Sequence, residues 1–337
     1  TAASRAAGEW SRNYTITRMI DKNRLLNELT PIAAALTQPG TNAQVTGFST
    51  TSLTFSFKEG TVGYVVDAAV LMNQVLDKVS QGGGELPIVR QEIDPPMTAE
   101  ELSKRFGKVS SATTNASFSD SNRLTNIKLA CKMVNGMAVQ PGETFSFNKT
   151  LGERTTKKGY KAAGALENGM HTKQVGGGIC QVSTTLFNAV AKADLKIVDR
   201  SPHSIPSVYV DLGKDAAVNW PNQDFKFRND GLYPVYIVAN LGKDKKITFS
   251  IYGKLLDDGV TIKIVSKKTG TTGPGADKII VDASLMPGEQ VVVEEARNGY
   301  TAETYRVYYN TDGTEIDRQR LFRSTYRPAG AVIRVGA

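Results

Sequence analysis

The sequence is poor in the residues that disulfide scaffolds and metal sites need. Its 337 residues include only two cysteines and two histidines. Two cysteines close at most one bridge, which excludes a disulfide-stapled fold. The two histidines have no acidic cluster at ligand spacing, so no zinc site is expected. Gly176–Gly178 lacks the Lys-Ser/Thr that follows a phosphate loop, and we predict no metal and no cofactor.

The sequence also lacks a long apolar run. No segment approaches the ~20 apolar residues of a membrane-spanning helix. The chain begins with Thr1 and shows no signal-peptide pattern, so we expect an export signal or an N-terminal membrane anchor to lie outside this sequence. A direct contact with the membrane is therefore expected only through such an anchor.

The formal net charge is +8, but no block of Lys and Arg with interleaved aromatic residues is present. A helix-turn-helix signature is also missing, so nucleic acid is not expected as a partner. A basic surface attracts other polyanions as well. Anionic wall polymers are the natural candidates if the protein is exported.

What the sequence does contain is a mixture of short helical and strand patterns, which predicts an α+β multidomain protein. The expected domains are residues 1–96 (α/β), 97–268 (α+β) and 269–337 (all β). Leu25, Leu26 and Leu29 have helical spacing, and Pro31 is expected to end or kink that helix. Helices are also predicted from about Asn122 and after Gly178, and strands at 208–210, 235–239 and 247–251.

The middle of the chain carries several separated motifs in order. They are Pro141–Asn148 (PGETFSFN), Gly152–Thr155 (GERT), Gly176–Thr185 (GGGICQVSTT), Arg200–Ser204 (RSPHS) and Asp215–Val218 (DAAV). Together they resemble the VanW family, over roughly residues 110–241. The last ~65 residues resemble a G5 domain, through Pro287–Glu289, Asp312-Gly313 and the tail from Tyr326. The N-terminal α/β unit resembles the peptidoglycan-binding domain found ahead of VanW domains.

The resemblance implies an extracytoplasmic protein in the cell wall, or anchored to the surface, of a Gram-positive-type envelope. Peptidoglycan is the implied partner, through its glycan strands or its stem peptides. G5 domains are associated with N-acetylglucosamine polymers, and VanW with vancomycin-resistance clusters. The resemblance implies no settled reaction, so the chemistry has to come from the residues.

One hypothesis is a cysteine nucleophile at Cys180. Glycines allow a sharp turn before it, and a helix N-terminus lowers the pKa of a thiol. Backbone amides there could also stabilise an oxyanion. His203 is the candidate base, and Asp215 would orient its ring. The reaction would be peptide-bond cleavage or acyl transfer on a stem peptide. The simpler interpretation is a small buried thiol, as we expect for Cys131.

The candidate substrate-binding residues flank this hypothetical nucleophile. They are Gln181, Thr184, Arg154, Ser204, Gly177 and Gly178. Gln181 in particular could donate a hydrogen bond to an oxyanion. The alternative is that the glycines only permit close packing of a helix.

A second hypothesis is cleavage of glycan strands by a lytic transglycosylase or a muramidase-like enzyme. It needs an acid with a raised pKa near the scissile oxygen. Glu143 is the candidate, because the aromatic run from Phe145 to Phe147 could bury it. Asp215 or Asp224 could be its partner. The competing interpretation is a turn carboxylate that accepts backbone hydrogen bonds.

A third hypothesis is a non-catalytic peptidoglycan-binding adaptor, in which wall-binding domains in series gain affinity through linkage. Tyr300, Tyr305, Tyr308 and Tyr309 could stack on sugar rings. Ordinary strand packing explains these tyrosines equally well.

Overall fold

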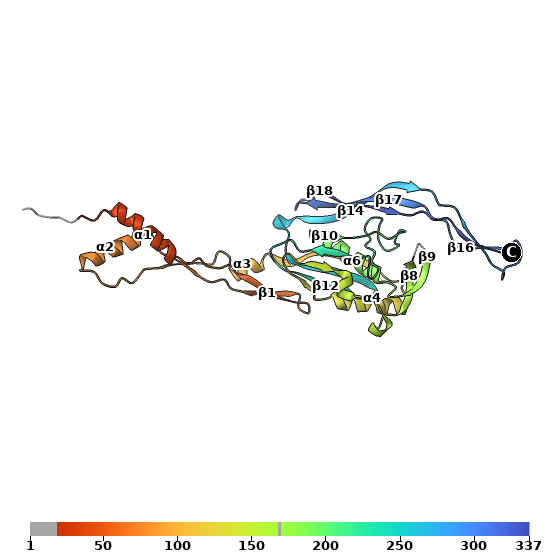
Figure 1. The fold of residues 1–337 in the computed structure, drawn as a ribbon, viewed down its shortest axis with the longest axis horizontal. Helices are drawn as coiled ribbons and strands as arrows, with labels where there is room; N and C mark the ends of the chain where they lie inside the picture. Colours follow the sequence, from red (N-terminus) through yellow and green to blue (C-terminus); the bar gives the residue numbers. More distant parts are fainter. Residues whose placement is uncertain (1–18, 168–169, 337) are drawn as a thin grey trace, which may run out of the picture. The chain divides into compact units, whose positions relative to one another are not determined.

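The computed structural model describes residues 19–167 and 170–336 (Figure 1). The chain divides into two compact units. One contains the residues up to Gln44 together with Lys58–Ala99, and the other contains Val45–Phe57 together with the chain from Glu100 onward. Both cysteines are free. None of the described helices is both long and apolar enough to span a membrane.

The first unit pairs two capped helices over a small core. Asp21 caps α1 (Lys22–Leu36) by accepting hydrogen bonds from two amides, and Asp67 caps α2 (Ala68–Ser80) in the same way. The buried residues of this core are Ala33 and Leu71 from the helices and Val66 from the segment just before α2. The strands are β3 (Gly63–Val65) and β4 (Gln91–Ile93), which pair antiparallel. Of the two outcomes expected at Pro31, an end or a kink, the end is wrong, because α1 continues through this residue to Leu36.

A short hairpin of β1 (Gln44–Ser49) and β2 (Thr54–Lys58) contributes aromatic side chains to the second unit. The Phe48 ring lies 5.1 Å from Tyr236 and 4.9 Å from Tyr252, measured between centroids. Phe55 packs edge-on against Phe106. Aromatic pairs of this kind hold the hairpin against the central sheet.

The second unit is built on a four-stranded sheet in the order β5-β13-β12-β6. These strands are β5 (Phe106–Asn115), β13 (Lys246–Lys254), β12 (Val235–Leu241) and β6 (Ala138–Val139). Two helices, α4 (Ser121–Val134) and α6 (Ile179–Lys192), pack against it (Figure 1). The helix predicted after Gly178 is confirmed, and its apolar residues Ile179, Val182 and Leu186 are all buried.

Smaller elements surround this core. They are α3 (Ala99–Ser103), β7 (Thr144–Ser146), α5 (Phe147–Leu151), β8 (Ala162–Glu167), β9 (Met170–Val175), β10 (Lys196–Asp199), β11 (Lys226–Arg228) and 3₁₀ turns at Thr156–Lys158 and Asp257–Gly259. Strands β10, β11 and β7 form a sheet, and β8 and β9 form a hairpin that leads into α6. The predicted strand at 208–210 is wrong, because those residues form a turn.

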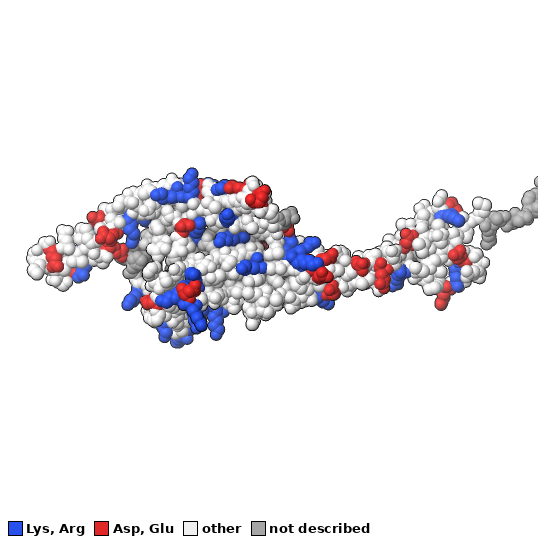
Figure 2. All heavy atoms as spheres, turned by 180° about the vertical axis from the view of Figure 1, so that it is seen from behind, with Lys and Arg blue, Asp and Glu red and all other residues white. Residues whose placement is uncertain are grey.

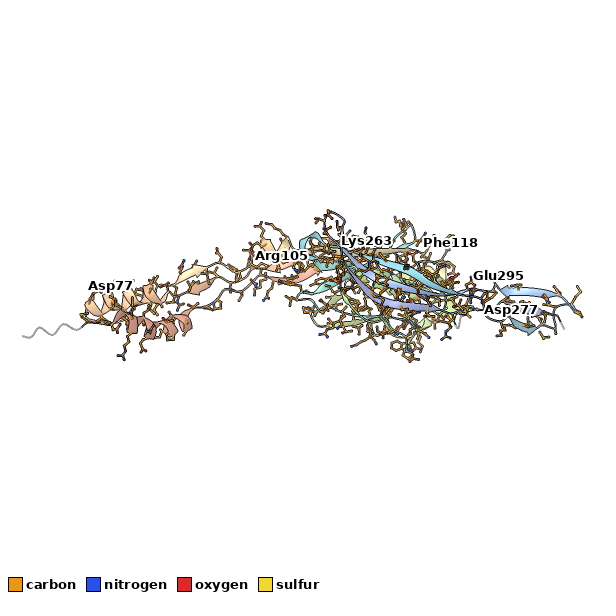
Figure 3. The ribbon with its side chains drawn as sticks, turned by 90° about the horizontal axis from the view of Figure 1, so that it is seen from above. Asp77, Arg105, Phe118, Lys263, Asp277 and Glu295 are labelled. Atoms are coloured by element: carbon orange, nitrogen blue, oxygen red, sulfur yellow. The ribbon has the colours of Figure 1, made fainter. Side chains whose placement is uncertain are left out.

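The C-terminal part is all β. A long antiparallel sheet contains β14 (Thr261–Thr272), β17 (Gly299–Tyr309) and β18 (Glu315–Tyr326). A short sheet contains β15 (Lys278–Val281), β19 (Val332–Val335) and β16 (Gln290–Glu294). In Figure 3, Lys263 marks the long sheet, and Asp277 and Glu295 mark the short one.

The long sheet covers the face of α6 that the central sheet leaves open. Arg306 of β17 is buried and donates to the carbonyls of Ala191 at 2.9 Å and Leu195 at 2.8 Å. It also forms a 2.7 Å ion pair with Asp194. As a result α6 is buried on nearly every side, including its polar residues Ser183, Thr184 and Thr185. On the face drawn in Figure 2, basic side chains alternate with acidic and uncharged surface.

Candidate functional site

Three consecutive glycines set the start of α6. Gly176 and Gly178 have φ of +91° and +106°, which other residues rarely adopt. A Cβ on Gly177 would lie 2.4 Å from the carbonyl oxygen of Ala163 on β8. The Gly177 carbonyl accepts a 2.9 Å hydrogen bond from the buried amide of Asn126 on α4. The loop therefore needs glycine for both its backbone conformation and its close packing.

This loop delivers Cys180 as the second residue of α6. The side chain is half-buried. Its Sγ donates to the carbonyl of Val218 at 3.3 Å and accepts from the Val218 amide at 3.5 Å. The amides of Ile179 and Gln181 on either side already donate to the carbonyls of Gly176 and Gly178. The thiol is thus held between the helix start and the strand-like segment after Asp215.

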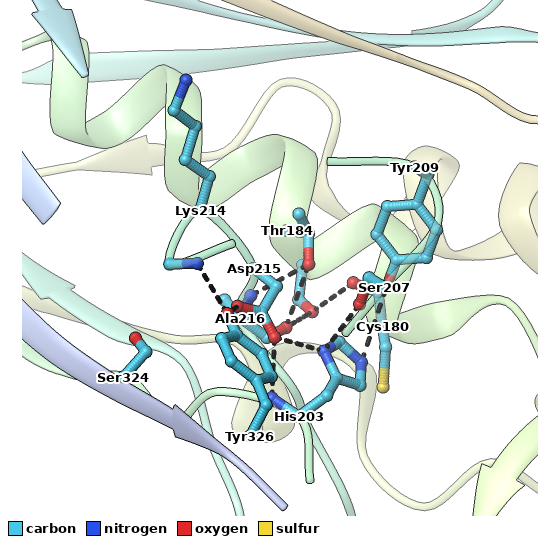
Figure 4. Close-up of polar contacts among 12 residues, drawn as sticks. Cys180, Thr184, His203, Ser207, Tyr209, Lys214, Asp215, Ala216, Ser324 and Tyr326 are labelled. Atoms are coloured by element: carbon cyan, nitrogen blue, oxygen red, sulfur yellow. Dashed lines mark hydrogen bonds and ion pairs between the residues drawn. The ribbon is translucent and has the colours of Figure 1, made fainter. Parts of the chain in front are cut away.

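The imidazole of His203 lies beside Cys180 and is fixed by Asp215 (Figure 4). The Nδ1 atom of His203 is 2.6 Å from Oδ2 of Asp215, and the same oxygen accepts the His203 backbone amide at 2.7 Å. Because the carboxylate can only accept, Nδ1 carries a hydrogen. The Nε2 atom is therefore the one that gains and loses a proton. Ser207 and Tyr209 also face the ring, at 3.1 Å from Nδ1 and 3.5 Å from Nε2.

Asp215 is itself buried and fully engaged. Its Oδ1 accepts a 2.9 Å hydrogen bond from Arg200 and a 2.6 Å hydrogen bond from the phenol of Tyr326. Arg200 lies over the rings of Phe187 and Phe322, at 5.6 Å and 5.2 Å from their centroids. A buried carboxylate with this many donors keeps its charge and one fixed orientation.

The pKa shifts of Cys180, His203 and Asp215 all favour the charged form of each group. Burial opposes ionisation of Cys180, but the hydrogen bond and charge of His203, the Val218 amide and the charge of Arg154 together bring its pKa below the usual value. Burial also opposes protonation of His203, yet Asp215 and Cys180 raise its pKa to about 9. The pKa of Asp215 is lowered, because His203 and Arg200 outweigh its burial. The arrangement favours a thiolate beside an imidazolium.

The C-terminal sheet supports the loop that carries His203 and Asp215. Thr304 of β17 donates to the carbonyl of Gly213 at 2.9 Å, and the Gly213 amide donates to the Tyr326 phenol at 2.6 Å. The amide of Arg327 donates to the carbonyl of Ser204 at 2.7 Å. Ser324 accepts a hydrogen bond from Arg200. The site is therefore built from two parts of the chain that are far apart in sequence.

The structure brings together Cys180, His203 and Asp215, the three residues of the hypothetical cysteine nucleophile. Two of the candidate substrate-binding side chains are used internally instead. Gln181 is buried and bonds to Arg123, Thr114 and the carbonyl of Asn115, so its amide is not available to an oxyanion. Thr184 is buried and accepts the Ala216 amide at 2.9 Å.

The remaining candidates have different surroundings. Ser204 is exposed, next to His203. Gly177 and Gly178 are buried in the loop before Cys180. Arg154 is half-buried and donates to the side chain of Asn148 at 2.7 Å.

Glu143 does not occupy the buried position expected of a catalytic acid. Its side chain is exposed and accepts the backbone amide of Gln140 at 2.8 Å within a turn. Asp224 is buried, but it accepts hydrogen bonds from Ser146, from the Asn148 amide and from its neighbour Phe225. The expectation of burial for Glu143 was wrong because Phe145 and Phe147 point into the core and leave the turn in solvent.

Sequence reasoning missed the groups that hold Asp215. Arg200 lies in the same motif as His203, and this was the signal in the sequence that could have indicated its role beside Asp215. Tyr326 lies more than a hundred residues further along the chain, and nothing near it in sequence indicates its role. Among the described residues, no group of three or more His, Cys, Asp or Glu side chains could hold a metal ion.

The comparisons with known families agree with the two resemblances. Residues 122–252 match a family model described as VanW like protein, and residues 265–337 match the G5 domain model. Tyr326 and Arg306 therefore belong to the G5 segment, whereas Cys180, His203 and Asp215 belong to the VanW segment.

Two curated relatives match part of the chain. The uncharacterized protein YoaR of Bacillus subtilis (strain 168) is 38% identical over 186 residues, which cover 55% of this chain and 61% of YoaR. The vancomycin B-type resistance protein VanW of Enterococcus faecalis (strain ATCC 700802 / V583) is 33% identical over 138 residues, covering 39% of this chain and 49% of that protein. The chain thus spans about half to three fifths of the length of these relatives.

Two solved G5 domain structures are also similar to part of the chain. The IgA1 protease G5 domain has 19% identity, covers 23% of this chain and 89% of its own, and has a TM-score of 0.17. The HP0197 G5 structure has 18% identity, covers 22% and 97%, and has a TM-score of 0.13.

Proposed function

We propose that this chain, which joins a VanW domain to a G5 domain, is a cell-wall-associated protein of the bacterial surface that acts on peptidoglycan stem peptides. The proposed reaction is cleavage or transfer of an acyl group at a peptide bond, with Cys180 as the nucleophile. The two matching families support the location in the wall. The chemistry rests on the residues of the site.

The observation that carries the proposal is the connected chain from Cys180 through His203 to Asp215. Nucleophilic catalysis needs a nucleophile, a base within reach and a third group that orients the base. Here the carboxylate holds Nδ1 at 2.6 Å, and His203 acts on the thiol of Cys180 through a hydrogen bond and through its charge. Cys131 offers a contrast within the same protein, because it is buried on α4 and burial raises its pKa to about 12.

In the first step the thiolate of Cys180 attacks the carbonyl carbon of the scissile peptide bond. A C–S bond forms and a tetrahedral oxyanion results. When the carbonyl re-forms, the C–N bond breaks and the leaving nitrogen takes the proton from Nε2 of His203. The products of this half-reaction are a free amine and a thioester on Cys180.

In the second step the neutral Nε2 of His203 removes a proton from the acceptor. If the acceptor is water, its oxygen attacks the thioester, the C–S bond breaks and a free carboxylic acid leaves. If the acceptor is the amine of another stem peptide, a new peptide bond forms instead. In both cases the thiolate and the imidazolium are restored, so the cycle needs no cofactor.

The other parts of the chain are proposed to hold it on its substrate. The G5 segment would bind wall glycans, and the N-terminal α/β unit would bind peptidoglycan. The net charge of +8 would favour anionic wall polymers as further partners. Linked weak sites raise the effective concentration of the enzyme at the wall.

The test is digestion of purified sacculi with the protein, followed by mass spectrometry of the released and retained muropeptides. New amino and carboxyl termini in stem peptides, or new cross-links, are expected with the native protein. Cys180→Ala and His203→Ala should abolish them, whereas the matched control Cys131→Ala should retain them.

Other outcomes would contradict the proposal. Activity that survives in Cys180→Ala would exclude the thiol. New reducing or anhydro sugar ends would point to glycan-strand cleavage. Intact sacculi that still retain the protein would point to a non-catalytic adaptor.

A further inference from the structure

Arg154 is a fixed cation with unused hydrogen-bonding capacity. Its Nη2 donates to Oδ1 of Asn148 at 2.7 Å, and its guanidinium lies over the ring of Phe147, 5.9 Å from the centroid. Its Nη1 is buried and has no hydrogen-bond partner. The charge of Asp224 acts on it, but the hydrogen bonds of that carboxylate come from Ser146, the Asn148 amide and the Phe225 amide. A buried charged donor without a partner is costly unless a ligand satisfies it.

The neighbours of Arg154 place it beside the candidate nucleophile. On one side its aliphatic stem packs against the glycine loop, since a Cβ on Gly176 would lie 3.0 Å from its Cβ. On the other side its partner Asn148 donates to the carbonyl of Asn219 at 3.4 Å. Asn219 follows Val218, whose backbone contacts Sγ of Cys180 on both its amide and its carbonyl. Arg154 is therefore connected to the surroundings of Cys180 in two ways, through the glycine loop before it and through Asn148.

The position of the guanidinium is set by buried groups. Asn148 is itself buried. Its backbone amide donates to Asp224 at 2.8 Å, and its side-chain amide donates to the carbonyl of Gln223 at 2.8 Å. With Nη2 held, the planar guanidinium presents Nη1 in one direction. Preorganised donors of this kind suit a planar carboxylate, because they are not reordered when it binds.

Resting on the function proposed above, we propose that Arg154 binds a carboxylate of the substrate beside Cys180. The preferred substrate is therefore a stem peptide with a free carboxylate close to the scissile bond, and not an uncharged segment of a longer peptide. The Nη1 donors are the recognition group, and Asn148 is the positioning residue that aims them. A lysine cannot replace this arginine, because it lacks the planar donors and the contact with Asn148.

The experiment compares two peptides that differ in one group. One is a synthetic stem peptide with a terminal carboxylate, and the other is the same peptide with a terminal amide. Binding is measured by calorimetry on the Cys180→Ala protein, so that the result does not depend on turnover. The acid is expected to bind roughly tenfold or more tightly than the amide. Adding Arg154→Gln should make the two affinities equal.

A matched control removes a neighbouring charge without touching the site. Lys157 is exposed on the 3₁₀ turn that follows Arg154, so Lys157→Gln should keep the preference for the acid. A third peptide, with its terminal carboxylate free and its side-chain carboxylates blocked as amides, identifies the source of the recognised group. Loss of binding to this peptide would assign Arg154 to a side-chain carboxylate.

Measuring cleavage as well as binding distinguishes a failure of carboxylate recognition by Arg154 from a failure of the proposed function. If the native protein cleaves neither peptide but its Cys180→Ala form still prefers the acid, the proposed function fails and Arg154 keeps its role. If Arg154→Gln lowers kcat/KM equally for acid and amide, the guanidinium serves the thiolate or the oxyanion, and carboxylate recognition is overturned. Equal binding of the acid, the amide and the peptide with blocked side-chain carboxylates by the Cys180→Ala protein would also overturn it.

Discussion

The phenol of Tyr326 donates a 2.6 Å hydrogen bond to the carboxylate of Asp215, although 111 residues separate them. The same phenol accepts the backbone amide of Gly213 at 2.6 Å. One hydroxyl group of the G5 segment thus holds both the carboxylate behind His203 and the loop that presents it.

Replacing Tyr326 with Phe removes this hydroxyl and keeps the ring. The Gly213 amide then loses its acceptor in a buried position, which costs about 1–3 kcal/mol of unfolding free energy. We also expect slower turnover, because Asp215 is oriented less firmly. Chemical denaturation and the rate of stem-peptide cleavage measure the two effects. Tyr305→Phe is the control, since its hydroxyl donates to Glu303 and both side chains are partly exposed. Equal effects of the two substitutions would contradict the role given to Tyr326.

The two cysteines should differ sharply in reactivity. The pKa of Cys180 is lowered by His203 and Arg154 despite its burial, whereas burial raises that of Cys131 to about 12. Iodoacetamide at neutral pH should therefore alkylate Cys180 first in the folded protein, because the thiolate is the reactive form. Peptide mapping by mass spectrometry gives the order. His203→Ala should slow the alkylation of Cys180, and modification of Cys131 at a similar rate in the native protein would refute this prediction.

The pH dependence of activity should show an alkaline limit. Attack and departure require an imidazolium beside a thiolate, and the pKa of His203 is raised to about 9. Activity is expected to fall as the pH rises through that value. The raised pKa of His203 also stabilises the folded protein. This stabilisation is complete below the unfolded pKa of ~6.5 and is lost as the pH rises through about 9.

Asp215→Asn tests the cause of this limit. Without the carboxylate, the pKa of His203 should fall, and the alkaline limit of kcat/KM should move to lower pH. The substitution also leaves Arg200 buried without its ion pair, which costs about 3–5 kcal/mol. Because the chain has two histidines, an imidazole titration by NMR needs only the variant His171→Gln for assignment. An unchanged limit in Asp215→Asn would show that another group sets it.

The glycine loop before Cys180 should tolerate no side chain at its centre. In Gly177→Ala the new Cβ would meet the Ala163 carbonyl at 2.4 Å, and the loop or β8 has to move. Overpacking of this kind costs about 1–3 kcal/mol and should displace Cys180. Gly164→Ala is the matched control, because its Cβ would meet nothing within 4 Å. Thermal unfolding and the alkylation rate of Cys180 distinguish the two variants.

Much of the site could be predicted because its residues lie in local motifs. Cys180 follows a glycine loop at a helix start, and His203 lies in a short motif downstream. The mixed α and β content and the β-rich C-terminal part are confirmed as well. The catalytic roles of these residues and the domain boundaries near 96 and 268 stay predictions.

The rest depends on contacts that periodicity does not report. The helical pattern predicted α6, but periodicity alone does not indicate that its polar residues Ser183, Thr184 and Thr185 are buried. The reason is that the central sheet and the C-terminal sheet enclose this helix from both sides. Glu143 next to two buried phenylalanines could not be assigned to core or solvent without knowing which way the turn faces.

The anchoring of Asp215 by Tyr326 has a consequence for how such proteins change by recombination of modules. A gene fusion that exchanged the G5 segment for an unrelated wall-binding module would also delete the phenol behind the histidine, and with it the cover of α6. A VanW segment that functions without a G5 neighbour must therefore supply a replacement donor from its own sequence. The VanW and G5 segments match separate family models, but in this chain we expect them to function, and to be inherited, only together.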